Sequence, residues 1–173
     1  SQSRGLGDVY KRQVLQYISA VLTGGKSSRM VKRMVDDEKL ALQVIAFNQA
    51  QEDYGKYLML SLPVGETSLE KLTATMDEEI EKIKSELISE REYEKVKNQF
   101  EVQFIQSNTR IEGIANSLAR AHMLYGDIDN INDQIDIYRS ITREEIKEIA
   151  NKYLNKSQRA VSYTHLTLPT NGT

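Results

Sequence analysis

The chain has 173 residues, of which 23 are Lys or Arg, 25 are Asp or Glu, and 39% are hydrophobic. This length fits a single domain. Because the chain has no cysteine, disulfides, thiolate zinc sites and cysteine nucleophiles are excluded, and its two histidines, His122 and His165, lie too far apart for a short metal-binding motif. The balanced charge gives no electrostatic footprint for nucleic acid, and no apolar run approaches the roughly 18 residues of a membrane span.

The two termini are related through their coding DNA. Residues 8–13 can be encoded by GATGTGTATAAGAGACAG, and the reverse complement of this DNA encodes residues 161–166 in one of its frames. This DNA resembles the transposon end that is used in the preparation of sequencing libraries. We therefore interpret residues 1–13 and 161–173 as adapter-derived and non-native, and 14–160 as the natural segment. The natural segment has 20 basic and 24 acidic residues, and His122 is its only histidine.

The first part of the natural segment predicts two helices. Residues 14–22 have apolar side chains at helical spacing and are followed by Gly24 and Gly25, which indicates a helix that ends at the glycines. Ser27 or Ser28 is expected to cap a second helix that runs to about residue 36.

Two strands are predicted next. Residues 41–49 and 56–62 are apolar and flank the polar stretch 51–55, which is typical of two antiparallel strands joined by a hairpin loop. The uninterrupted apolar run 58–60 indicates that at least one strand is interior to a larger sheet.

The rest of the natural segment predicts helices. Three motifs resemble capping boxes, in which a Ser or Thr precedes a Glu by three positions: Thr67 to Glu70, Ser89 to Glu92 and Thr142 to Glu145. Apolar stripes follow each motif, and the stripe after Ser89 predicts a long helix over 90–125 with a bend near 107–113. A short helix is expected over 131–141, and a strand at Arg159. This order of elements argues for an α+β fold.

Candidate sites in the natural segment each have an ordinary structural interpretation. Residues 24–28 (Gly-Gly-Lys-Ser-Ser) suggest a phosphate loop, but position 20 is Ala rather than Gly and a helix, not a strand, precedes the loop, so a helix-ending turn explains them. His122 has no acidic residue three or four positions away and is interpreted as a packed or surface histidine. The carboxylates at 36–38 lack the alternation of a calcium loop. The acidic residues at 77–81 and the lysines of the same region are interpreted as solvated helix faces.

An ordered set of motifs nevertheless resembles the C-terminal domain of pitrilysin/insulinase-family zinc metallopeptidases. The matching segments are 22–33 (Leu-Thr-Gly-Gly-Lys-Ser-Ser-Arg-Met-Val-Lys-Arg), 40–44 (Leu-Ala-Leu-Gln-Val), 53–55 (Asp-Tyr-Gly), 89–99, 141–146 and 150–154, and together they extend over essentially all of 14–160. The resemblance implies an α/β roll, incomplete here, with helices packed on one face of an antiparallel sheet.

The resemblance also implies a function. The zinc motif of the family, H-x-x-E-H, belongs to an N-terminal domain that this chain lacks. We therefore expect no catalytic, cofactor-binding or metal-binding residue here, and zinc only in the parent enzyme. The expected role is that of a non-catalytic domain that encloses a chamber and contributes to the binding of peptide or unfolded protein. Its expected partners are the N-terminal catalytic domain of the same chain and a second subunit. The resemblance is compatible with a location in either the bacterial cytoplasm or the periplasm.

One departure from the family leaves an alternative open. Some members of the family have an Arg and a Tyr, seven residues apart, that help to bind substrate, and the matching positions here are Val35 and Leu42. Neither side chain can donate a hydrogen bond, so a partner would have to supply these groups. The alternative is a non-enzymatic core or interaction subunit, or a helical scaffold, without proteolytic activity.

Overall fold

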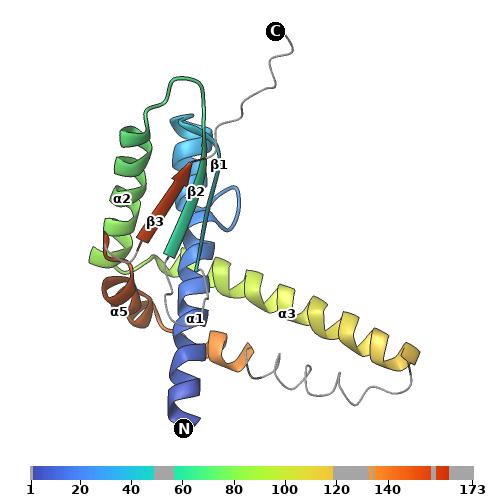
Figure 1. The fold of residues 1–173 in the computed structure, drawn as a ribbon. Helices are drawn as coiled ribbons and strands as arrows, with labels where there is room; N and C mark the ends of the chain where they lie inside the picture. Colours follow the sequence, from blue (N-terminus) through green and yellow to red (C-terminus); the bar gives the residue numbers. More distant parts are fainter. Residues whose placement is uncertain (1, 49–56, 119–132, 134, 157–158, 164–173) are drawn as a thin grey trace.

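The computed structural model describes residues 2–48, 57–118, 133, 135–156 and 159–163. The elements follow the order α1 (Gln2–Thr23), the π-helical η1 (Val31–Asp37), β1 (Ala41–Asn48), β2 (Tyr57–Pro63), α2 (Leu69–Ser85), α3 (Glu90–Leu118), α5 (Arg143–Tyr153) and β3 (Arg159–Tyr163) (Figure 1). Residues 135–140 are also helical. The mixed helices and strands confirm the α+β fold class.

The strands form one sheet in the order β1-β2-β3. β1 and β2 are antiparallel, with Ile45 opposite Leu60, as the two apolar segments predict. β3 differs from the expected antiparallel sheet because it runs parallel to β2. Between β2 and β3 the chain forms α2, α3, the helical residues 135–140 and α5, and such a long connection returns the chain to the starting end of the sheet, which gives a parallel pair.

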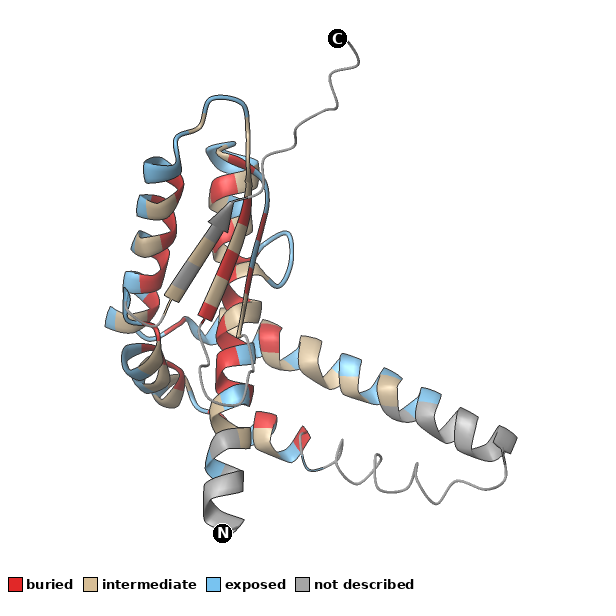
Figure 2. Ribbon diagram, viewed as in Figure 1, coloured by how far each residue is buried: buried red, intermediate tan, exposed pale blue. Residues whose placement is uncertain are grey.

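The core lies between α1, the sheet and α2. Apolar side chains of α1 from Val14 to Leu22 are buried at the predicted spacing, as are Leu72, Met76 and Ile80 of α2. The strands contribute alternate side chains such as Met59 to this core, so one face of the sheet is covered by helices. Figure 2 shows the buried positions of α1 and α2 turned toward the strands.

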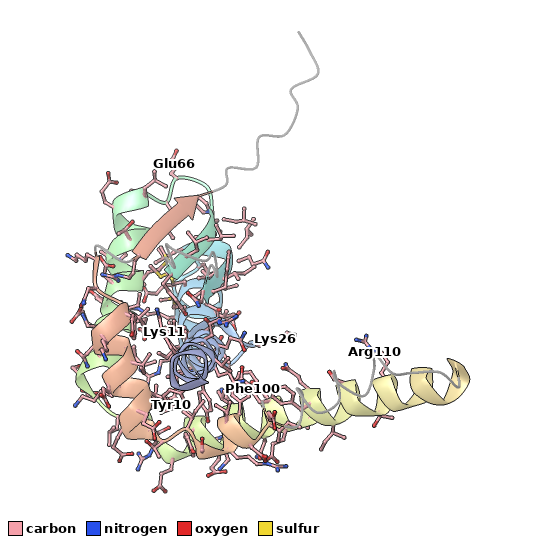
Figure 3. The ribbon with its side chains drawn as sticks, turned by 60° about the horizontal axis from the view of Figure 1, so that its bottom comes forward. Tyr10, Lys11, Lys26, Glu66, Phe100 and Arg110 are labelled. Atoms are coloured by element: carbon pink, nitrogen blue, oxygen red, sulfur yellow. The ribbon has the colours of Figure 1, made fainter. Side chains whose placement is uncertain are left out.

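A group of aromatic rings in contact joins α1, through Tyr17, to the first part of α3. Tyr17 lies with its ring centroid 5.7 Å from that of Tyr93 and 5.5 Å from that of Phe100. Phe100 in turn stacks on Tyr138 at 4.4 Å. Figure 3 labels Phe100 beside the end of α1. These contacts fix the proximal part of α3, and beyond them the helix projects from the body (Figure 1).

The helix starts test the predicted caps. Ser89 and Thr142 accept hydrogen bonds from the backbone N–H groups of Glu92 and Glu145, as predicted. The cap of α2 lies one residue after the predicted one. Ser68, and not Thr67, caps the helix and accepts a hydrogen bond from the backbone N–H of Lys71. Thr67 instead donates to the carbonyl of Val64, which closes the preceding turn.

Two further predictions need correction or fall outside the structure. The second helix begins at Arg29, directly after Ser28, but the Ser28 hydroxyl donates to the carbonyl of Gly25 and does not act as the predicted side-chain cap. α3 continues as one helix through the positions of the expected bend. The hairpin loop at 51–55, His122 and His165 lie outside the described residues.

Candidate functional site

The loop between α1 and η1 contains the most distinctive motif of the sequence, and its geometry is that of a tight helix end. The N–H of Gly24 donates to the carbonyl of Ala20 at 2.9 Å. A Cβ at Gly24 would lie 2.5 Å from that carbonyl oxygen, so only glycine fits there. Ser28 is buried and donates to the carbonyl of Gly25. A helix precedes this loop, as the interpretation of a helix-ending turn requires, whereas a phosphate loop follows a strand.

Arg29, directly after this loop, forms a bidentate ion pair with Glu92 in the first turn of α3. Both nitrogen-to-oxygen distances are 2.8 Å. The Glu92 hydrogen bonds raise the pKa of Arg29, and Arg29 in return lowers the pKa of Glu92. The pair joins two of the motifs that carry the family resemblance, at 22–33 and 89–99, and connects the segment before η1 to the first turn of α3.

Arg33 of η1 contacts three carboxylates, of which those of Glu78 and Glu79 belong to α2. Its guanidinium contacts Glu38 at 2.6 Å, Glu78 at 2.6 Å and Glu79 at 3.0 Å. The hydrogen bonds that Arg33 donates to Glu38, and then to Glu78, raise the pKa of Arg33, and Arg33 lowers the pKa of Glu78. Glu79 is buried and also pairs with Lys82. The acidic run at 77–81, predicted as a solvated face, therefore contributes Glu79 to an internal ion-pair cluster.

The two positions that match the substrate-binding Arg and Tyr of the family differ in exposure. Val35 is half-buried and packs against the core, whereas Leu42 on β1 is 57% exposed. β1 has an irregular register between Ala41 and Gln43, and Leu42 lies within this irregularity. Neither position offers a hydrogen-bond donor from its side chain.

The structure shows no metal site in the ranges that it describes. Groups of three or more His, Cys, Asp or Glu residues placed to hold a metal ion are absent from those residues. The carboxylates of Asp36 and Asp37 are exposed, and Glu38 contacts Arg33. None of the helices in the same ranges is long and apolar enough to cross a membrane.

The model of a protein family described as the Peptidase M16 inactive domain matches residues 4–100, which is more than half of the chain. The chain belongs to this family. Membership confirms the resemblance to pitrilysin-like metallopeptidases and explains why the motif set describes a domain without the catalytic sequence.

Relatives of this inactive domain include zinc proteases. The chain is 26% identical over 150 residues to the zinc protease PqqE of Helicobacter pylori, an alignment that covers 86% of this chain and 34% of that protein. The chain thus spans about a third of the length of this relative.

Solved structures show the same fold. A protease from Helicobacter pylori matches with a TM-score of 0.71 at 22% identity, over 89% of this chain and 37% of that one. A candidate zinc protease from Bordetella pertussis Tohama I matches with a TM-score of 0.65 at 24% identity, over 86% and 82% of the two chains. The inactive peptidase domain of a candidate zinc protease from Bordetella parapertussis matches with a TM-score of 0.67 at 22% identity, over 86% and 79%.

Sequence reasoning missed the ion pairs that organise this inactive domain. Arg29 and Glu92 are 63 positions apart, and nothing in a single sequence indicates that they meet. The signal that the sequence offered is that Arg29 and Glu92 stand in two separate family motifs. A charged motif residue without a catalytic role often pairs with another residue of the fold.

Proposed function

We propose that this inactive domain is the non-catalytic C-terminal domain of a zinc-dependent endopeptidase. In this proposal it encloses a chamber and contributes to the binding of peptide or unfolded protein, while an N-terminal domain of the same polypeptide carries zinc in an H-x-x-E-H motif. The observation that carries the proposal is the family match together with the zinc protease PqqE, a relative of which the alignment with this chain covers only 34%. When bound in such a motif, zinc polarises water and the scissile carbonyl.

The proposed function is tested by comparing two proteins, the 173-residue chain and the full-length polypeptide that contains residues 14–160. Both are incubated with β-casein, an unfolded protein substrate. We expect the full-length protein to cleave casein in a chelator-sensitive manner and the 173-residue chain to leave it intact. A full-length protein without activity would contradict the proposal.

The alternative is a non-enzymatic core or interaction subunit. Val35 and Leu42 favour it, because they stand where some relatives of this domain have donors that help to bind substrate. The upstream gene sequence separates the two functions. An H-x-x-E-H helix some way before residue 14 supports the peptidase, and a reading frame that starts nearby without one supports the alternative.

We propose as well that residues 1–13 and 161–173 are non-native. The support for this proposal is the relationship between the two termini in their coding DNA, since the DNA that can encode residues 8–13 is the reverse complement of DNA for residues 161–166. Resequencing the gene by a transposon-free method tests it, because a native locus that encodes the same termini would contradict it.

A further inference from the structure

β1 stands at an edge of the sheet, because the order of the described strands is β1-β2-β3. The backbone N–H and C=O groups along the free side of an edge strand can pair with another extended chain. Charged residues and proline on the edge strand are two common features that prevent this pairing. β1 contains neither, so its edge depends on another form of protection.

The composition of β1 makes such protection important. Apart from Gln43 and Asn48, every residue of β1 is apolar, and the strand contains no glycine. Short uncharged segments of this kind, with high β-propensity, are the ones that pair with further copies of themselves. The irregular register between Ala41 and Gln43 disturbs only the first residues of the strand. The regular part, 43–48, lacks this interruption.

The last residue of α1 contacts the free edge within this regular part. The backbone N–H of Ala46 donates a hydrogen bond of 3.0 Å to the hydroxyl oxygen of Thr23. This N–H therefore points away from β2. Because the N–H groups of successive residues point to opposite sides of a strand, those of Val44 and Asn48 point the same way as that of Ala46. A further strand would pair with this row, and Thr23 occupies its central member.

The hydroxyl of Thr23 is held in place by a second hydrogen bond. It donates to the carbonyl oxygen of Ser19, one turn earlier in α1, at 3.2 Å. The hydroxyl of Ser19 lies 2.7 Å from that of Tyr57, the first residue of β2. The end of α1 is thus connected to both strands. In the view of Figure 1, the chain that leaves α1 passes on the side of β1 opposite to β2.

We propose that the hydroxyl of Thr23 closes the free edge of β1 against a strand from a second copy of this chain. The inference does not depend on the proposed function. While the N–H of Ala46 donates to Thr23, it does not donate to an incoming carbonyl, and the side chain of Thr23 stands where that carbonyl would lie. Without the hydroxyl, this N–H lacks its partner, and β1 of a second copy can supply one.

Thr23→Val tests the inference, because valine keeps the shape of threonine but lacks the hydroxyl. The matched control is Thr109→Val in α3. The hydroxyl of Thr109 also donates to a carbonyl four residues earlier, that of Ile105, but its side chain is exposed and stands far along the chain from β1. Thr23→Ser keeps the hydroxyl and should behave as the wild-type chain.

Two measurements follow the edge. Hydrogen exchange, observed by NMR, should show the backbone amide of Ala46 exchanging about tenfold faster or more in Thr23→Val than in the wild-type chain. Thioflavin T fluorescence, which reports stacked strands, should rise after a lag that is shorter by about threefold or more in Thr23→Val than in Thr109→Val.

A second substitution separates an open edge from a general loss of stability. Gln43 is exposed on β1, and a lysine at this position places a charge on the edge strand, which opposes strand pairing. The double variant Thr23→Val with Gln43→Lys should therefore have the same lag as Gln43→Lys alone. Aggregation that starts from unfolded molecules would not be corrected in this way.

Three results would overturn the inference. One is an unchanged exchange rate of the Ala46 amide in Thr23→Val, since the hydroxyl would then not hold the edge. Another is an equal lag in Thr23→Val and Thr109→Val. The third is a double variant that aggregates as fast as Thr23→Val, because the loss of the hydroxyl would then act through unfolding and not through the edge of β1.

Discussion

At the scale of single residues, the pair of Arg29 and Glu92 makes a specific contribution to stability. The two side chains are 20% and 27% exposed and share two hydrogen bonds. Replacing Glu92 by Gln removes the charge and should lower the free energy of unfolding by about 1 kcal/mol, between the values for exposed and buried charged pairs. Urea denaturation measures this change.

Glu90→Gln is the matched control for that substitution. Glu90 stands in the same helix turn, its side chain is 84% exposed, and its contact with Arg143 is longer, at 3.6 Å. Its replacement should change the free energy of unfolding much less. If the two substitutions lowered the free energy of unfolding equally, the bidentate geometry of the Arg29–Glu92 pair would make no contribution to stability.

The same pair predicts a dependence on pH. Arg29 lowers the pKa of Glu92 in the folded chain, so folding favours the ionised carboxylate. This contribution is fully present above the ordinary pKa of Glu, about 4.3, and is lost as the pH falls through the lower folded value. The stability difference between the wild-type chain and Glu92→Gln should therefore shrink below about pH 4. A difference that stays constant from neutral to acidic pH would contradict this account of the pair.

At the scale of elements, the end of α1 depends on one glycine. A Cβ at Gly24 would lie 2.5 Å from the carbonyl oxygen of Ala20, whereas the nearest atom to a Cβ at Gly25 is 3.9 Å away. Gly24→Ala should therefore destabilise the chain by about 1–3 kcal/mol, as is typical of overpacking, and Gly25→Ala should have little effect. Thermal unfolding of the two variants measures the contrast, and similar losses in both would refute the close-approach argument.

Local patterns predicted the elements better than their exact ends. The apolar stripes of α1 and α2 and the pairing of β1 with β2 follow from periodicity, because burial on one side leaves a repeat in the sequence. The cap of α2 was misplaced by one residue because Thr67 and Ser68 both suit the position, and only the turn at Val64 decides between them. The parallel direction of β3 and the pairing of Arg33 with Glu79 depend on tertiary structure. Local sequence patterns do not predict contacts between residues so far apart in the chain.

At the scale of the whole molecule, membership in a family of inactive peptidase domains agrees with a sequence that contains no H-x-x-E-H motif. The fold provides a sheet, helices on one of its faces, and ion pairs that connect η1 to α2 and the segment before η1 to α3. The family resemblance was accessible from sequence because several motifs recur in a fixed order.

The central claim is that this domain belongs to a zinc enzyme without holding the zinc itself. Metal analysis of the purified full-length polypeptide and of the 173-residue chain, both dialysed against metal-free buffer, tests it most directly. We predict about one zinc per full-length molecule, as a single H-x-x-E-H site would bind, and none in the chain. A tightly bound stoichiometric zinc in the 173-residue chain, or a full-length protein that binds none, would contradict the account.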